Sequence, residues 1–234
     1  MIAAGHTFTT KSDTEVLLHG YEQWGVDLLQ RVRGMFTFVI WDKNKQELFG
    51  ARDHFGIKPF YYAKMNGTFM YASEIKSLLR HPDFVKELNA EALKPYMTFQ
   101  YPAIGETFFK GVYKLPEGHY FTYRDGKMDI HRYYDEDFRE GKQKLGELVN
   151  SIDQTVCDSV KAHQIADVEV GSFLSSGVDS SYVAAVARPQ HTYSIGFGKG
   201  TYNESQQAGE LAELLKLNNT ACLLYTSPSP RDRS

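Results

Sequence analysis

The fold of the second half of the chain is decided by residues 168–187, which read VEVGSFLSSGVDSSYVAAVA. The first part, Val168 to Leu174, is apolar, β-branched and aromatic, and it predicts a buried strand. The last part is rich in Ala and Val and predicts a helix that ends before Pro189. A short polar loop, residues 175–181, joins them. The stretch therefore predicts a strand, a tight loop and a helix in succession.

The loop has the features of a phosphate-binding site. The first N–H groups of a helix lack partners and carry partial positive charge, small side chains let an anion approach, and serine hydroxyls add donors. No Gly-Lys-Ser/Thr is present, so this is not a Walker-type loop. Asp179 in place of a lysine predicts a site that holds pyrophosphate through Mg²⁺, with Asp179 as an oxygen ligand. The alternative is an ordinary helix cap built from Ser and Asp.

The loop and its flanks resemble the pyrophosphate loop of N-type ATP pyrophosphatases, in the version found in glutamine-hydrolysing asparagine synthetases. The resemblance implies that Ile195 and Gly196 end a strand whose backbone meets adenine, with Phe173 or Leu174 nearby. Alternatively, the side chains of Ile195 and Phe173 belong only to the core. The implied residues for ATP and pyrophosphate are Phe173, Leu174, Ser175, Ser176, Gly177, Asp179, Ser180, Ser181, Ile195 and Gly196. The commoner family form has Gly where this chain has Ser176; if that backbone needs a positive φ, Ser costs on the order of 1 kcal/mol.

Composition limits the function further. The chain has 234 residues and a formal net charge of −3, which argues against a general nucleic-acid or membrane-surface binder. No apolar run approaches the length of a membrane-spanning helix, and the first residues do not resemble a signal peptide. Its two cysteines make neither a disulfide framework nor a metal site, so we expect a soluble protein of the reducing cytoplasm.

The first half alternates helix and strand signals, which predicts an α+β layered domain. A helix is expected from a Ser12 or Asp13 cap to Gly25, with Val16, Leu17, Tyr21 and Trp24 on its buried face. The other expected elements are a helix over 26–32, hairpins of 35–41 with 47–52, 60–63 with 68–72 and 119–124 with 128–134, a short helix to 79 and a helix over 90–97.

Isolated polar groups in this half predict no catalytic centre by themselves. Arg52-Asp53-His54 is more typical of a structural ion pair beside a turn than of a catalytic pair. The histidines, among them His19 and His81, show no metal-ligand spacing.

Five segments of this half, taken in order, nevertheless resemble later motifs of the class II glutamine amidotransferase domain. They are residues 12–15, 34–36, 52–59, 72–76 and 115–119. The resemblance implies a partial α+β domain of the N-terminal nucleophile type, in which Asp13 binds the amino group of glutamine by a charge-assisted hydrogen bond. Family members use an N-terminal cysteine whose own α-amino group acts as the base. This chain begins Met1-Ile2 and lacks the Asn-Gly-Glu motif, so no catalytic residue is assigned and we expect no glutamine hydrolysis.

The second half predicts the start of a doubly wound α/β domain, here a partial ATP-pyrophosphatase domain. An apolar stripe runs from Leu145 to Val160 and predicts a helix, on which Cys157 is expected to be buried and inert. A strand over 192–197 and a helix over 203–216 follow, the helix with Ala208, Leu211, Leu214 and Leu215 inward. The expected domains are residues 1–138 and 139–222, and residues 223–234 are interpreted as a disordered tail or a cloning scar.

The sequence as a whole predicts a fragment, truncated at both ends, of an asparagine synthetase. The resemblance implies a parent that makes asparagine from aspartate, ATP and glutamine through a β-aspartyl adenylate, releasing AMP and pyrophosphate, with ATP and Mg²⁺ as cofactors. Its expected partners are these small molecules, with a homodimer possible for the parent. Two alternatives stay open: a related amidotransferase acting on another carboxylate or closing a lactam ring, and a non-catalytic regulatory or decayed relative.

Overall fold

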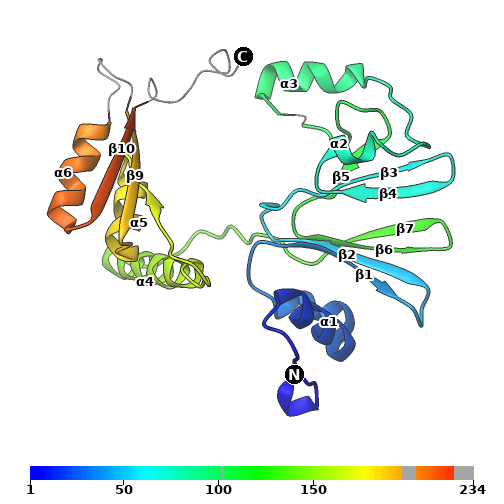
Figure 1. Cartoon of the computed structure of the whole chain (residues 1–234), viewed down its shortest axis with the longest axis horizontal. Helices are drawn as coiled ribbons and strands as arrows, with labels where there is room; N and C mark the ends of the chain where they lie inside the picture. Colours follow the sequence, from blue (N-terminus) through cyan, green and yellow to red (C-terminus); the bar gives the residue numbers. More distant parts are fainter. Residues whose placement is uncertain (102, 197–203, 224–234) are drawn as a thin grey trace. The chain divides into compact units, whose positions relative to one another are not determined.

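The computed structural model describes residues 1–101, 103–196 and 204–223. The chain divides into two compact units, residues 1–138 and 139–234, and each is described by itself (Figure 1).

The first unit begins with the 3₁₀ turn η1 (Ile2–Ala4) and the helix α1 (Asp13–Trp24). The Ser12 hydroxyl accepts a hydrogen bond from the Thr14 N–H at 3.2 Å, and Gly25 closes the helix with φ 59°, where a side chain would be strained. The predicted second helix is instead a 3₁₀ helix, η2 (Gly25–Gln30). It packs tightly on α1, because a Cβ at Gly20 would lie 2.4 Å from Leu28 Cδ1.

Two antiparallel sheets form the centre of this unit. One has the order β1-β2-β6-β7 and the other the order β4-β3-β5. Their strands are β1 (Thr37–Asp42), β2 (Glu47–Arg52), β3 (Tyr61–Met65), β4 (Thr68–Ala72), β5 (Val112–Lys114), β6 (His119–Arg124) and β7 (Lys127–Arg132). The predicted hairpin turns are confirmed: Asn66 and Gly67 have φ 49° and 82°, and Asp125 and Gly126 have φ 50° and 76°. Two successive positive φ values are typical of the type I′ turn.

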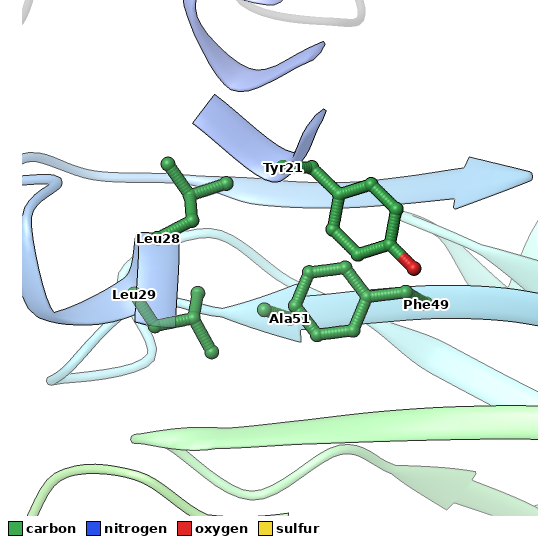
Figure 2. Packing of buried hydrophobic residues seen from close by; sticks show 5 residues of the cluster. All are labelled: Tyr21, Leu28, Leu29, Phe49 and Ala51. Carbon is green, nitrogen blue, oxygen red and sulfur yellow. The ribbon is translucent and has the colours of Figure 1, made fainter. Parts of the chain in front are cut away.

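Alternate side chains of each strand point to opposite faces of its sheet, so each sheet packs against a helix on one face and against the other sheet on the other face. Phe49 and Ala51 of β2 pack with Tyr21 of α1 and with Leu28 and Leu29 of η2 (Figure 2). The rings of Tyr21 and Phe49 are stacked, with centroids 5.1 Å apart. A second cluster lies between the two sheets: Phe60, Leu115 and Phe121, with Val39, Leu48, Tyr62, Phe69, Tyr123 and Met128 around them. A third joins the outer face of the smaller sheet to the short helix α2 (Ile75–Leu78) through Ala63, Met70, Leu78 and Val112. The unit therefore has the predicted α+β layers.

The rest of this unit is a helical excursion. The Asn89 side chain accepts a hydrogen bond from the Glu91 N–H at 3.2 Å and starts the 3₁₀ turn η3 (Ala90–Ala92), which continues into α3 (Leu93–Phe99). The helix predicted over 90–97 is thus present, with a 3₁₀ first turn.

The second unit has a three-stranded parallel sheet of order β10-β9-β8. Its elements are α4 (Leu145–His163), β8 (Ser172–Phe173), α5 (Val178–Ala187), β9 (His191–Gly196), α6 (Ser205–Leu215) and β10 (Asn218–Leu223). Leu174 packs with Ala184 of α5 and with Ala208 and Ala212 of α6. Helices that alternate with parallel strands give the predicted α/β class. Among the described helices of the chain, none is long and apolar enough to cross a membrane.

Burial in this unit is lower than its apolar sequence suggests in two places. Strand β8 has only two residues, and the side chains of Phe173 on this strand and of Val168 before it are 77% and 78% exposed. The first half of the α4 stripe is also exposed: Leu145, Leu148, Val149 and Ile152.

Smaller corrections concern single positions. Val16 of α1 and Leu214 of α6 are exposed, although both were predicted to face inward. Strand β10 was not predicted, and Leu223, assigned from sequence to the tail, is its last residue. Phe197, Asn203 and residues 224–234, for which the sequence makes predictions, lie outside the described residues.

Candidate functional site

The loop between β8 and α5 is held by a small ring of serine hydrogen bonds. The Ser175 N–H donates to Ser180 Oγ at 3.2 Å, and the two hydroxyls are 2.8 Å apart. The Gly177 N–H donates to Ser175 Oγ at 3.2 Å. The loop is thus closed by its own hydroxyls across the first turn of α5, just beyond the carboxyl end of β8.

The first turn of α5 is anchored on a single carbonyl. Ser181 Oγ and Ser180 Oγ donate to the Gly177 oxygen at 2.7 and 3.1 Å, and the Ser181 N–H reaches it at 3.1 Å. The N–H groups that precede Ser181 in this turn have no intrahelical acceptor, which is the geometry of an anion site. Ser176, at the position where the family more often has Gly, is not among the residues with positive φ, so its side chain causes no backbone strain.

A cavity of about 320 Å³ opens beside the loop. It is lined by five residues that the sequence assigned to ATP: Phe173, Leu174, Ser175, Ser180 and Ile195. Phe173 and Ile195 are 77% and 51% exposed, so the alternative that their side chains belong only to the core is wrong.

Two further residues line this cavity, Tyr193 and Glu204, and sequence reasoning did not assign them. Tyr193 was detectable, because it lies two residues before Ile195 on β9 and a strand places such residues on the same face. No comparable signal marks Glu204, which precedes α6.

The other assigned residues of this region do not line the cavity. Ser176, Gly177 and Asp179 are exposed, Ser181 is half-buried, and Gly196 is buried at the end of β9. A Cβ at Gly177 would lie 3.3 Å from Ser175 Oγ, so the absence of a side chain keeps the approach to the backbone open. An exposed carboxylate at Asp179, beside free helix N–H groups and hydroxyls, fits both a phosphate and the oxygen coordination that Mg²⁺ prefers.

In the first unit, the residue assigned to glutamine lies in the first turn of α1. Asp13 is exposed, and its Oδ1 is 3.5 Å from the hydroxyls of Ser12 and Thr14. A carboxylate there is stabilised by the helix dipole and is free to contact a ligand.

Arg52 and Asp53 are structural, but they do not form the predicted ion pair in the described structure. The buried Arg52 guanidinium donates to the carbonyl oxygens of Lys58 and Leu115, both at 2.7 Å, and to that of Gly56. The buried Asp53 carboxylate instead accepts the N–H groups of the loop that follows it, at Phe55, Ile57 and Lys58.

Electrostatics at this pair follow from burial. Burial lowers the pKa of the Arg52 guanidinium, and the charges of Glu117 and Asp53 oppose that shift. Both charged groups therefore hold loop backbone, which is a structural role.

Neither cysteine lies in the first unit. Cys157, expected to be buried, is only half-buried on α4, and Cys222 is exposed on β10.

Comparison with known proteins agrees with this architecture. Residues 1–134, more than half of the chain, match the glutamine amidotransferase domain family. The chain belongs to this family. Residues 151–227 match a second family, asparagine synthase, so the part of the chain with the serine loop has its own relatives. The glutamine amidotransferase domain followed by the start of an α/β domain, expected from the motifs, is confirmed.

Individual relatives match this chain across both of its units. The chain is 41% identical over 222 residues to asparagine synthetase [glutamine-hydrolyzing] 1 of Bacillus subtilis, and the match covers 93% of this chain and 35% of that protein. Asparagine synthetase [glutamine-hydrolyzing] 3 of the same organism is 35% identical, with 83% and 33% covered. Amidase chry2 of Gibberella zeae is 34% identical over 76% of this chain and 27% of its own length. The resemblance to glutamine-hydrolysing asparagine synthetases is thus confirmed, and the chain spans about a third of the length of the Bacillus relatives.

Proposed function

We propose that the chain is part of a glutamine-hydrolysing asparagine synthetase and that its serine loop holds the phosphates of ATP. The observation that supports this most directly is the cavity beside Ser175 and Ser180, which lies at the carboxyl ends of parallel strands. Open α/β sheets bind their ligands at that edge. In the proposed reaction a β-carboxylate oxygen of aspartate attacks the α-phosphorus of ATP, pyrophosphate leaves, and ammonia from glutamine then displaces AMP from the β-aspartyl adenylate.

The residues of the loop would act on the pyrophosphate. The N–H groups of the first turn of α5 and the hydroxyls of Ser175, Ser180 and Ser181 would stabilise charge that develops on the departing oxygens. The exposed Asp179 carboxylate would hold Mg²⁺, which supplies Lewis-acid neutralisation of the same oxygens when bound. Phe173 and Ile195 would form the apolar wall for adenine. In the first unit, Asp13 would receive the amino group of glutamine.

Mg-ATP binding to the chain tests this assignment. We expect equilibrium dialysis to show ATP binding that depends on Mg²⁺, and the isosteric Asp179→Asn variant to weaken it at least about tenfold, the value of one charge-assisted contact. Asp158→Asn changes an equally exposed carboxylate on α4 and serves as the matched control. Binding that is the same in EDTA and in Mg²⁺, or the same in both variants, would contradict the role of Asp179. No ATP binding by the wild-type chain would contradict the role of the loop.

We further propose that the chain as printed does not hydrolyse glutamine. Its only cysteines are Cys157 and Cys222, both in the second unit, so the amidotransferase unit offers no thiol nucleophile. Glutamate release from glutamine by the purified chain, at a rate above that of a heat-denatured sample, would refute this proposal.

A second candidate function is amide formation on a carboxylate other than that of aspartate. Its support is that one relative, similar over 76% of this chain, is named as an amidase and not as an asparagine synthetase, so this architecture is not tied to asparagine alone. ATP–pyrophosphate exchange by the protein, measured with aspartate and then with other carboxylates, distinguishes the two. Exchange stimulated only by aspartate favours asparagine synthesis.

A further inference from the structure

The segment before α1 turns back along the helix and brings two histidines together. His6 of that segment and His19 of α1 have their Nδ1 atoms 3.2 Å apart. Glu22, one turn further along α1, places its Oε2 2.8 Å from His19 Nδ1 and 3.6 Å from His6 Nδ1. Three possible metal-ligand atoms thus converge. His6 and His19 are thirteen positions apart in the sequence, and His19 and Glu22 are three apart, a spacing that no linear motif would reveal.

The three separations match the geometry of a metal centre. In a tetrahedral Zn²⁺ site with metal–nitrogen distances of about 2.05 Å, neighbouring donor atoms lie about 3.3 Å apart. The observed separations of 2.8, 3.2 and 3.6 Å lie on both sides of that value and need only small side-chain adjustments. The imidazoles are shielded, with 17% and 18% of their side chains exposed, whereas Glu22 is 53% exposed. The Glu22 side therefore gives a path of entry and room for a water molecule as fourth ligand.

The Nε2 atoms of the two histidines, which face away from the site, contact acceptor groups of their own. His6 Nε2 lies 3.0 Å from Gln23 Oε1, an acceptor, so this nitrogen carries the proton and His6 Nδ1 is left with its lone pair. His19 Nε2 lies 3.7 Å from the Glu15 carboxylate, while His19 Nδ1 lies 2.8 Å from Glu22 Oε2, so a metal ion would take the place of any proton shared between His19 Nδ1 and Glu22. Glu15 is itself fixed by the N–H groups and hydroxyls of Thr9 and Thr10. Carboxylate and amide oxygens behind each histidine are the usual outer shell of a metal site.

We propose that His6, His19 and Glu22 form a binding site for a divalent transition metal, with Zn²⁺ as the preferred ion. Two imidazoles and one carboxylate with an open fourth position are a ligand set that Zn²⁺ accepts. The ion would tie the segment that leads to Asp13 onto the helix that Asp13 begins, and so stabilise the start of α1. A proton competes with the metal ion for this place, because the hydrogen bond to Glu22 raises the pKa of His19.

Zinc titration of the full chain in competition with a chromophoric chelator tests the proposal. All proteins in the titration carry Cys222→Ser, because an exposed cysteine also offers a ligand for Zn²⁺. We expect one Zn²⁺ per chain and a rise in the thermal unfolding midpoint when ZnCl₂ is added. Glu22→Gln keeps the size of an exposed side chain, so it leaves the fold intact by far-UV circular dichroism, and we expect it to weaken binding at least tenfold and to abolish the thermal shift.

Two further variants separate a built site from general histidine binding. Gln23→Leu removes only the acceptor behind His6 and is expected to weaken Zn²⁺ binding by about tenfold, the usual effect of an outer-shell change. His81→Gln is the matched control, since His81 also lies beside a carboxylate, Asp83, but has no second histidine near it in the described structure, and its loss should leave binding unchanged. Absence of Zn²⁺ binding by the parent protein, or equal affinity in the parent and Glu22→Gln, would overturn the proposal in favour of a protonated His19.

Discussion

Replacement of Gly50 by alanine tests how closely strand β2 packs against the ring of Phe121. Gly50 lies on β2 directly opposite Phe121 on β6. A Cβ at position 50 would lie 2.3 Å from Cε1 and 2.5 Å from Cζ of the Phe121 ring. Carbon atoms in contact are about 3.5 Å apart, so the ring and the strand would have to separate by about 1.2 Å. Phe121 is fully buried, and Phe60 and Phe69 lie 5.5 and 5.9 Å away between their ring centroids, so the ring has no free volume to enter.

The expected loss follows from two opposing effects. Inserting a methyl group into a filled core costs about 1–3 kcal/mol. Loss of glycine's freedom in the unfolded chain returns about 0.4–1 kcal/mol. Because the clash involves a buried aromatic ring and the backbone of a central strand, we expect a value in the upper part of the range, a net decrease of about 2 kcal/mol in the free energy of unfolding. For a unit of this size that lowers the unfolding midpoint by roughly 5–10 °C.

Urea and thermal unfolding of the wild type and of Gly50→Ala measure this difference. Gly105→Ala is the matched control in the same unit, because a Cβ there meets no atom within 4 Å. A double variant that adds Phe121→Leu to Gly50→Ala should recover part of the loss, since the smaller side chain vacates the overlapping volume. If Gly50→Ala unfolds at the same urea concentration as Gly105→Ala, the close contact between β2 and the Phe121 ring is not a feature of the protein.

Three further predictions concern buried or shielded polar groups. Arg52→Met leaves three loop carbonyls without their donor and should destabilise the first unit by at least about 3 kcal/mol in urea unfolding. Asn219→Ala removes the acceptor of the buried Thr192 and Ser194 hydroxyls, at 3.0 and 2.9 Å, and should cost the second unit about 1–3 kcal/mol in the same assay, more than a change at a surface asparagine. The hydrogen bond to Asp153 raises the pKa of Tyr182 to about 12, so its stabilising contribution is complete below pH 10 and is lost as the pH rises through about 12. Asp153→Asn should lower that pKa towards 10 in a tyrosinate absorbance titration, and an unchanged titration would disprove the contact.

Local signals in the sequence predicted much of the first unit. The Ser12 cap, the Gly25 stop and the two tight turns were predictable because each depends on a few neighbouring residues. The β2 strand has the predicted bounds, Glu47–Arg52, since its apolar run is limited by turn residues on one side and a charged loop on the other.

The errors lie where structure depends on distant residues. The apolar stripe of α4 predicted the helix, and Cys157 on it was expected to be buried, but periodicity states only which residues share a face and not whether another element covers that face. Strand β10 was missed because its start is polar, and Asn219 is satisfied there by hydroxyls of the neighbouring strand. The meeting of His6 with His19 was invisible for the same reason, since it depends on a turn in the chain between them.

The candidate site was only partly predictable. The serine loop is a contiguous motif, so its location followed from the sequence, and five assigned residues line the cavity beside it. The contribution of Glu204 could not be foreseen, because it reaches the cavity from the start of α6. The roles assigned to Asp13 and Asp179 stay predictions.

The closed ring of hydroxyls in the loop determines how an anion can gain affinity there. Ser175 and Ser180 already bond to each other and to the backbone, so a phosphate must exchange these bonds for its own and gains little enthalpy from them. The net attraction then comes from the field of the α5 terminus and from any cation that accompanies the ligand. Deleting the Ser180 hydroxyl removes one donor to the anion but also frees the Ser175 hydroxyl to bind it, so the two effects on affinity partly cancel. Ionic strength should therefore govern affinity at this loop more strongly than the loss of any single hydroxyl.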